Sequence, residues 1–338
     1  MSAPLTLPLI DISPFLAKKP DSFARRSTAD ALRQACLRFG FFYLRGFESV
    51  VSAADMEEAL AVARAFFNRP QAEKDELKIR KGDGARGYQK LGENKTQNRP
   101  DAHEGWDAYK PVSDEDPLKL LHGPNLWPAE PSSFRPVLER WVDKMHVLGE
   151  ALMDATALSL ELDDAECAKM KEWTSDPFWV MRCIGYPPLP KDAEGVSCGA
   201  HKDYGNFTLL HADSTQGALQ VFLRGSSGST VEGGERGVWI NADPVEGTFV
   251  VNVGEMVEVY SAGLYKATLH RVIHKAPSYR VSIPFFYEPS FEAVIEPLPT
   301  AVRLRKALLD ESTSALPKKQ HYGEFLKGKV SNNFYSSP

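Results

Sequence analysis

The sequence predicts a mainly β protein, a sandwich or jelly roll with flanking helices, and two observations support this. From residue 178 onward, short strand-like runs alternate with Gly- and Pro-containing turns, without long helical patterns between them. These runs cover residues 178–187, 206–212, 218–224, 238–241, 248–253, 267–274 and 279–287. The preceding half instead carries apolar residues at helical spacing. The helices are therefore expected to flank a β core.

Composition indicates an ordinary soluble globular protein. The 338 residues are 43% hydrophobic and 25% charged, which suffices for a sizeable core. The net charge of −5, without a basic block, predicts no nucleic-acid partner. The N-terminus lacks a signal-peptide pattern, and no apolar run approaches the roughly 20 residues of a membrane span. The four cysteines show no metal-site or disulfide spacing. We therefore expect a cytoplasmic protein with no membrane partner.

The N-terminal part of the chain is expected to contain two short strands and two amphipathic helices. Residues 7–15 predict a short strand that ends in a turn, and residues 41–47 form a compact aromatic strand. Two amphipathic helices are expected from apolar residues three and four apart, the first at Ala29, Leu32, Cys36 and Phe39, the second at Met56, Leu60, Ala63 and Phe67. Gly40 and the 68–70 stretch are placed to end them. These elements are predicted to support the β core.

The remaining segments outside the strands have different expected roles. Residues 82–111 show little periodicity, and a loop this long is usually functional. Apolar residues across 132–160 predict the longest helix, packed against the β core. The Gly-rich segment 224–237 lacks the lysine and following helix of a phosphate-binding loop, so a hairpin connection is expected. Residues 300–311 and 318–327 predict C-terminal helices.

Two histidines and a carboxylate suggest a metal site. His201 and Asp203 lie two apart at the start of a strand-like run, so both side chains would face one side. His270 lies on a later run. Two imidazoles and one carboxylate form the facial triad that holds Fe(II) and leaves other positions open. His274, four residues on, would share the strand face of His270 and is the alternative third ligand.

A second pair lies ten residues beyond His270. Arg280 and Ser282, again two apart on a strand, offer a guanidinium and a hydroxyl on one face. A guanidinium binds a carboxylate through two parallel hydrogen bonds. The pair therefore suits the carboxylate of a dicarboxylic co-substrate.

The combined pattern His201-x-Asp203, His270 and Arg280-x-Ser282 resembles the non-haem Fe(II)/2-oxoglutarate dioxygenases of the isopenicillin-N-synthase-like superfamily. The resemblance extends to the N-terminal Pro-x-Ile-Asp and covers nearly the whole chain. It implies a double-stranded β-helix, a distorted jelly roll, at residues 177–290. It also implies an N-terminal α/β region at 1–120, a support helix at 130–165, and C-terminal helices and a tail at 298–338.

The resemblance implies the chemistry as well. Fe(II) would be held by His201, Asp203 and His270, and 2-oxoglutarate and O2 would be co-substrates, with ascorbate as a stimulant. A C–H bond of a small organic molecule would be oxidised, most simply by hydroxylation, while 2-oxoglutarate is converted to succinate and CO2.

The same resemblance places the distal carboxylate of 2-oxoglutarate on Arg280 and Ser282. Tyr186 matches the second tyrosine of the family's Asn-Tyr-Tyr-Pro stretch and would donate its hydroxyl to that carboxylate. Ile184 and Gly185 replace the preceding Asn and Tyr, so the asparagine contact of those relatives is missing here.

The substrate pocket is expected to draw on the 82–111 loop and on strand residues chosen by alternation. The candidates are Tyr88, Glu104, Trp106, Phe178, Phe207, Leu209 and Phe286. These aromatics, and the lack of a cationic cluster around the expected mouth, favour a planar or mostly apolar small molecule. A monomer is the expectation from the family.

Two alternatives stay open at this point. An Fe(II) oxidase of the isopenicillin N synthase type would use the same triad without 2-oxoglutarate, and succinate release distinguishes the two. A catalytically silent small-molecule-binding protein on the same scaffold would lack a tight Fe(II) site that depends on His201.

Overall fold

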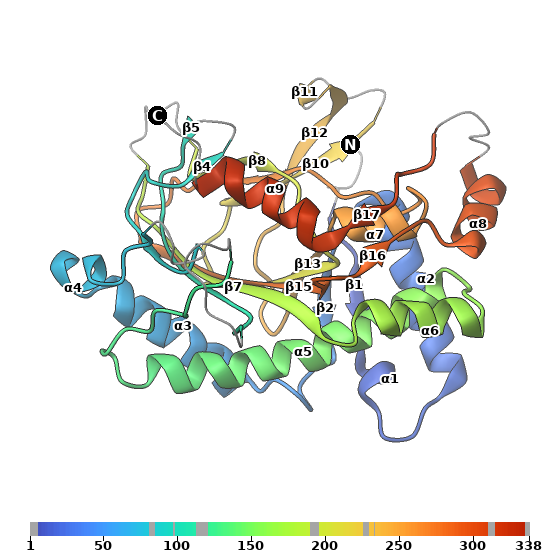
Figure 1. Cartoon of the computed structure of the whole chain (residues 1–338), viewed down its shortest axis with the longest axis horizontal. Coiled ribbons are helices and arrows are strands. Elements are labelled where there is room, and N and C mark those ends of the chain that lie inside the picture. The colour runs from blue at the N-terminus through green and yellow to red at the C-terminus, as the bar shows by residue number, and fades with distance from the viewer. Residues whose placement is uncertain are drawn as a thin grey trace.

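Two facing β-sheets form the centre of the computed structural model (Figure 1). The structure describes residues 6–80, 85–96, 99–112, 121–189, 196–225, 230–232, 234–309 and 315–334. The large sheet has eight strands in the order β1-β2-β13-β9-β15-β7-β6-β3, and the small sheet has five in the order β11-β12-β10-β14-β8. The predicted mainly β fold with flanking helices is confirmed, and the paired sheets form a jelly roll.

The strands of the large sheet come from both halves of the chain. They are β1 (Leu9–Asp11), β2 (Phe41–Arg45), β3 (Gly87–Gln89), β6 (Glu104–Tyr109), β7 (Pro177–Tyr186), β9 (Phe207–Ala212), β13 (Phe249–Val253) and β15 (Arg280–Ser290). The small sheet comprises β8 (Cys198–His201), β10 (Leu219–Arg224), β11 (Thr230–Glu232), β12 (Glu235–Asn241) and β14 (His270–Val272). Two further pairs join β4 (Lys95–Thr96) to β5 (Arg99–Pro100) and β16 (Val294–Ile295) to β17 (Gln320–His321).

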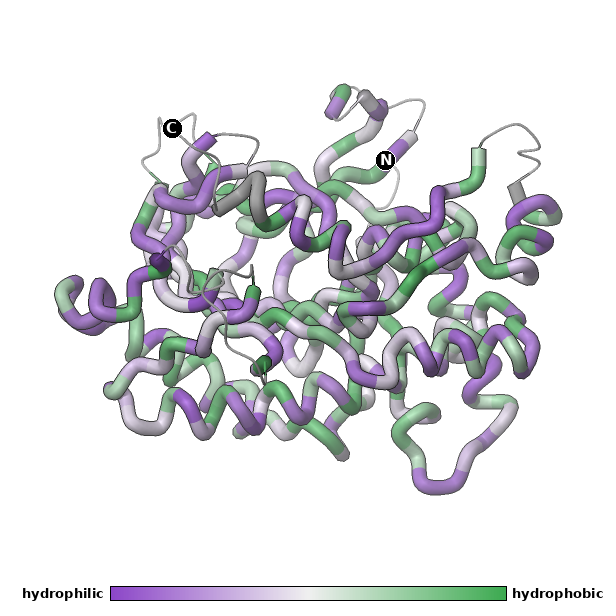
Figure 2. The backbone as a smooth tube through the Cα atoms, viewed as in Figure 1, coloured by the Kyte–Doolittle hydropathy of each residue, from purple (hydrophilic) through white to green (hydrophobic). Residues whose placement is uncertain are grey.

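Helices pack around this β core. They are α1 (Ser13–Leu16), α2 (Ser22–Arg38), α3 (Ala53–Phe67), α4 (Gln71–Asp75), α5 (Phe134–Ser159), α6 (Asp164–Trp173), α7 (Glu255–Tyr260), α8 (Pro299–Leu309) and α9 (Tyr322–Phe334). In Figure 1, α5 and α9 lie on opposite sides of β15. The α5 tube alternates between hydrophilic and hydrophobic residues (Figure 2), as expected for a helix with one buried face. No described helix is long and apolar enough to cross a membrane.

The large sheet separates two hydrophobic clusters. Its outer face packs on α2, α3 and α5 in one extensive cluster that includes Leu209, Val281, Phe285 and Tyr287. Its inner face meets the small sheet in a smaller cluster that includes Ile184, Tyr186, Val221 and Val250. Alternation along each strand therefore sends one set of side chains to the helices and the other into the jelly roll.

Several element predictions were wrong in detail. The 82–111 stretch, expected to be a loop, contributes β3 and β6, which extend the large sheet beyond β7. Its periodicity is weak because β3 is buried along its whole length and β6 along nearly all of it. Residues 13–15 form part of α1 rather than strand, and β14 covers only the middle of the expected 267–274 run. Helices α6 and α7 were not predicted.

Candidate active site

His201, Asp203 and His270 meet at the edge of the small sheet. The Nε2 atoms of both histidines lie 3.6 Å from Asp203 Oδ1, and one ligand atom from each residue lies within 4.8 Å of the others. His201 and His270 are register partners on the antiparallel strands β8 and β14. His201 is the last residue of β8, so Asp203 lies in the following turn rather than on the strand as expected.

Hydrogen bonds aim each ligand atom at the common point. His201 Nδ1 lies 2.8 Å from the Gly199 carbonyl, and His270 Nδ1 lies 3.1 Å from the Thr268 carbonyl. A carbonyl only accepts, so each Nδ1 carries a proton, and Nε2 is the nitrogen of each ring that is left to bind a metal. Carbonyl contacts of this kind orient metal-bound imidazoles. Two imidazole nitrogens and a carboxylate oxygen are a donor set that fits Fe(II).

The two oxygens of Asp203 have separate roles. Oδ2 accepts hydrogen bonds from the Thr208 hydroxyl at 2.5 Å and the Asn252 amide at 2.7 Å, which leaves Oδ1 facing the imidazoles. Burial alone would raise the pKa of Asp203, but the two imidazoles and these hydrogen bonds hold it below its usual value. Burial lowers the pKa of His270 to about 4, so this imidazole is neutral near pH 7.

The structure brings His270 rather than His274 to the other two ligands. His274 is buried, and its Nε2 lies 2.6 Å from the Ser278 carbonyl. The His274 ring therefore binds the backbone of the turn before β15 and does not face Asp203. Of the two histidines left open by the sequence, His270 is the one whose ring faces the site.

Arg280 carries unmatched hydrogen-bonding capacity inside the jelly roll. Its side chain is buried, and Nε and Nη1 have no hydrogen-bond partner among the described residues. Its guanidinium lies 4.7 Å from the ring centroid of Tyr186, its register partner on β7. Ser282 is buried two residues along the same face of β15. A buried guanidinium with unused donors fits a carboxylate, as on 2-oxoglutarate.

The packing around position 185 explains why this residue is a glycine. A Cβ atom at this position would overlap the Tyr279 hydroxyl, so no larger residue fits without displacing that ring. The space beside Gly185 is thus filled by Tyr279, which approaches from the segment before β15.

A cavity of about 460 Å³ opens beside the triad and includes His201 and Asp203 in its lining. Val180 and Phe286 supply apolar surface, while the charged lining residues are Lys95, Arg182, Lys202, Glu255, Glu288 and Lys329. The expectation of a mouth without a cationic cluster was therefore wrong. The cations come from β4, β7, the turn after β8, and α9, so no local run of the sequence reveals them.

The predicted substrate residues divide between the cavity and the cores. Phe286 lines the cavity. Phe207 and Leu209 are buried in the outer cluster between the large sheet and the helices, while Phe178 is buried on the other face of the sheet, against Tyr109 and Phe291. Phe207 and Leu209 of β9 face outward. Thr208 lies between them and faces inward, where its hydroxyl donates to Asp203, and side chains alternate along a strand. Trp106 is also in the outer cluster, with its indole donating to the Leu126 carbonyl.

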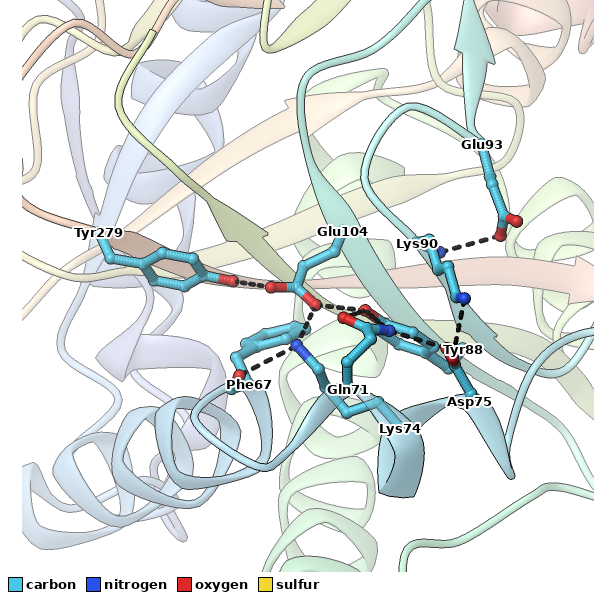
Figure 3. Close-up of polar contacts among 9 residues, drawn as sticks. All are labelled: Phe67, Gln71, Lys74, Asp75, Tyr88, Lys90, Glu93, Glu104 and Tyr279. Atoms are coloured by element: carbon cyan, nitrogen blue, oxygen red, sulfur yellow. Dashed lines mark hydrogen bonds and ion pairs between the residues drawn. The ribbon is translucent and has the colours of Figure 1, made fainter.

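Glu104 and Tyr88 belong to a buried polar network outside the cavity lining (Figure 3). Glu104 pairs with Lys74 at 2.7 Å and accepts hydrogen bonds from the hydroxyls of Tyr88 at 2.5 Å and Tyr279 at 2.7 Å. These residues come from α4, β3, β6 and the segment before β15. The structure thus gives both predicted residues a packing environment that joins four distant segments.

Sequence reasoning did not assign roles to Thr208, Asn252, Arg182 or Glu288. Thr208 and Asn252 carry no motif, and only their register pairing across β9 and β13 brings both to Asp203. Glu288 could have been found from alternation, since it shares strand parity with Arg280 and Ser282. A charged residue on the inward face of a buried strand is the available signal.

Comparisons with known proteins agree with this geometry. Residues 7–130 match the family model described as non-haem dioxygenase in morphine synthesis N-terminal, and residues 175–289 match the 2OG-Fe(II) oxygenase superfamily. Homoarginine-6-hydroxylases from Glycine max and Oryza sativa are 39% and 38% identical, each covering 97% of both chains. A Neurospora crassa protein crystallised in complex with alpha-KG and thymine is similar in structure, with a TM-score of 0.76, 26% identity and 96% of both chains covered. The chain therefore belongs to the 2-oxoglutarate- and Fe(II)-dependent oxygenases, and it is an enzyme that uses Fe(II) and 2-oxoglutarate.

Proposed function

We propose that this oxygenase hydroxylates a C–H bond of a cationic amino acid of the homoarginine class. The observation that carries the proposal is the 39% identity to a homoarginine-6-hydroxylase over 97% of both chains. The lining of the cavity beside the triad supports it, because it includes the buried Glu288 carboxylate, whose Oε2 has no hydrogen-bond partner among the described residues. An apolar planar substrate would leave the buried Glu288 Oε2, which has no hydrogen-bond partner among the described residues, without a partner.

His201, Asp203 and His270 would hold the iron. Bound iron supplies the activation of O2, coupled to decarboxylation of 2-oxoglutarate. The protein's part is orientation: the Gly199 and Thr268 carbonyls fix the two imidazole rings, and Thr208 and Asn252 fix the carboxylate. The lining residues Val180 and Phe286 would keep water from the substrate carbon.

Arg280 would receive the distal carboxylate of 2-oxoglutarate. The free Nε and Nη1 donors of this buried side chain support the assignment. Ser282 lies on the same strand face, and the Tyr186 ring lies against the guanidinium, so both hydroxyls are candidates to donate to the same carboxylate.

Anaerobic titration tests the iron and 2-oxoglutarate sites together. Chelation of Fe(II) by 2-oxoglutarate gives a visible charge-transfer band, which the wild-type protein should show. We expect His270→Ala to lose the band and Arg280→Ala to need much more 2-oxoglutarate to reach it. Arg271→Ala is the matched control, because this nearby guanidinium already stacks on Trp239 and binds Gln220. A band that survives in His270→Ala but disappears in His274→Ala would reverse the choice of third ligand.

Substrate class is tested by turnover. The iron-loaded enzyme with O2 and 2-oxoglutarate should release succinate faster when homoarginine is added, and should form a product one oxygen atom heavier. Apolar planar compounds are the comparison set. Succinate release stimulated by that set, and not by cationic amino acids, would overturn the proposed substrate class while leaving the reaction class intact.

A further inference from the structure

The inner face of β15 carries a charge at each end. Arg280 and Ser282 lie at its start, Phe286 lies further along, and Glu288 lies near its end, all at alternating positions. Phe286 and Glu288 line the cavity beside the triad. The same strand therefore runs from the guanidinium proposed for the co-substrate to a carboxylate in the substrate cavity.

Glu288 is a buried carboxylate whose charge is not matched. It is 3% exposed, and its Oε2 atom has no hydrogen-bond partner among the described residues. Its carboxylate occupies the space where a Cβ atom on Gly205 would lie, which places it close to the turn that carries Asp203. Burial raises the pKa of Glu288 to about 8, although the neighbouring Tyr322 hydroxyl lowers it. With this pKa the carboxyl group is mostly protonated near pH 7 in the empty cavity, and a cation beside it would favour its ionised form.

The other carboxylates that line the described cavity already face positive or metal-binding groups. Asp203 faces the two imidazoles of the triad. Glu255 pairs with Lys329 at 2.8 Å. Glu288 differs from both, because no ion pair to it is found among the described residues. An incoming cation would find its counter-charge at Glu288.

The ion pair of Arg182 with the buried Asp107 lies along the same wall. Arg182 on β7 donates Nε to Asp107 at 2.7 Å and Nη2 to Gln89 at 3.2 Å, and it also lines the cavity. The register partners Val180 and Phe286 lie between Arg182 and Glu288 on the paired strands. Four residues along a strand span about 13 Å, a length that suits an extended amino acid with a long side chain.

We propose that Glu288 binds the cationic side-chain end of the substrate and sets its specificity, at the end of the cavity wall that runs from Arg182 past the Val180–Phe286 pair. This inference rests on the proposed function and identifies the cavity residue that recognises the positive charge of the substrate. A carboxylate and a guanidinium form two parallel charge-assisted hydrogen bonds. A neutral analogue leaves the buried carboxylate unpaired and is therefore discriminated against strongly.

The test compares homoarginine with its neutral isostere homocitrulline, in which an oxygen replaces the terminal imino nitrogen. Both are assayed with wild-type enzyme, Glu288→Gln, and the matched control Glu255→Gln, whose carboxylate is already paired. Succinate release and hydroxylated product give kcat/KM. Perturbation of the anaerobic iron–2-oxoglutarate band gives the substrate Kd without turnover. The band itself, measured before substrate is added, reports that each variant is folded and loaded.

We expect Glu288→Gln to weaken homoarginine binding by roughly 100-fold, as when one partner of a buried charge pair is removed. The wild-type preference for homoarginine over homocitrulline should fall to within about tenfold in Glu288→Gln and persist in Glu255→Gln. An unchanged preference in Glu288→Gln overturns the role of Glu288 and leaves the proposed function standing. A wild-type enzyme that oxidises no cationic amino acid overturns both proposals.

Discussion

At the scale of single residues, the site depends on how the Asp203 carboxylate is held. Thr208 and Asn252 are register partners on β9 and β13, and both donate to the same oxygen of Asp203. The other oxygen faces the two imidazoles, at the proposed iron site. Partners of this kind fix the orientation of a ligand and raise the metal affinity of the site.

Replacing Asn252 with Leu should therefore weaken Fe(II) binding without removing a ligand. Outer partners of metal ligands typically contribute roughly 10–100-fold in affinity, so we expect a loss of that size. Anaerobic Fe(II) titration of the wild type and the variant measures it. Asn241→Leu is a control, since Asn241 is an exposed strand asparagine at the end of β12. Equal Fe(II) affinity in the wild type and Asn252→Leu would show that Thr208 alone suffices.

At the scale of elements, β15 is buried on both faces and serves two functions. Its inward set holds Arg280, Ser282 and Glu288, while its outward set packs on the helices through Val281, Ile283, Phe285 and Tyr287. A strand covered on both sides reads as a nearly continuous apolar run. The polar inward residues therefore stand out against an apolar background.

Gly149 of α5 fits this interface, because a Cβ atom there would overlap the Tyr287 ring. Alanine favours a helix over glycine by about 1 kcal/mol, but overpacking a core usually costs about 1–3 kcal/mol. We expect Gly149→Ala to lower the free energy of unfolding, as measured by denaturant titration. Val147→Ala on the exposed side of α5 is the control and should be near neutral. Stabilisation by Gly149→Ala would mean that Tyr287 moves aside freely.

At the scale of the whole molecule, the Glu104 network joins the N-terminal region to the strand that carries Arg280. Lys74 is buried on α4 and also donates to the Phe67 carbonyl at 3.1 Å. Tyr279, immediately before β15, donates to Glu104. Burial, followed by the nearby Glu104 carboxylate, raises the pKa of Tyr279, so its hydroxyl stays a donor.

Glu104→Gln should leave the Lys74 ammonium buried without its counter-charge. Removing one partner of a buried ion pair costs about 3–5 kcal/mol, and we expect a loss near the lower end because Glu104 is slightly exposed. Thermal and denaturant unfolding measure the change. The double variant Lys74→Met/Glu104→Gln should recover part of the loss, since no unpaired charge remains. A destabilisation unchanged by the second substitution would assign the loss to the tyrosine hydrogen bonds instead.

Much of the molecule could be predicted from local patterns. Apolar spacing at three and four located α2, α3 and α5 to within a few residues at most ends, because one face of each helix packs on the core. Short strand-like runs between Gly- and Pro-containing turns located β7, β9, β13 and β15. The segment 82–111 was misread as loop, because strands buried on both faces lose the alternation that identifies a strand.

Local sequence patterns predicted the triad but not the residues that line the cavity. The spacing of His201, Asp203 and His270 predicted three side chains that the structure brings together, a donor set that fits Fe(II). Loop and alternation arguments for Tyr88, Glu104, Trp106, Phe207 and Leu209 led to residues that pack outside the cavity. Strand parity alone does not say which face is inward until the neighbouring sheet is known.

The sequence by itself determined the jelly-roll class, the chemistry of the metal site and the family, because these depend on residue types at fixed spacing. Only the tertiary structure decided which residues line the cavity beside the triad. Glu288, Arg182 and Lys329 come from two strands and a C-terminal helix, and the register of β15 on β7 brings the first two to one wall. Whether a buried charge is matched depends on such distant neighbours, and this property distinguishes the unpaired Glu288 from the paired Glu255.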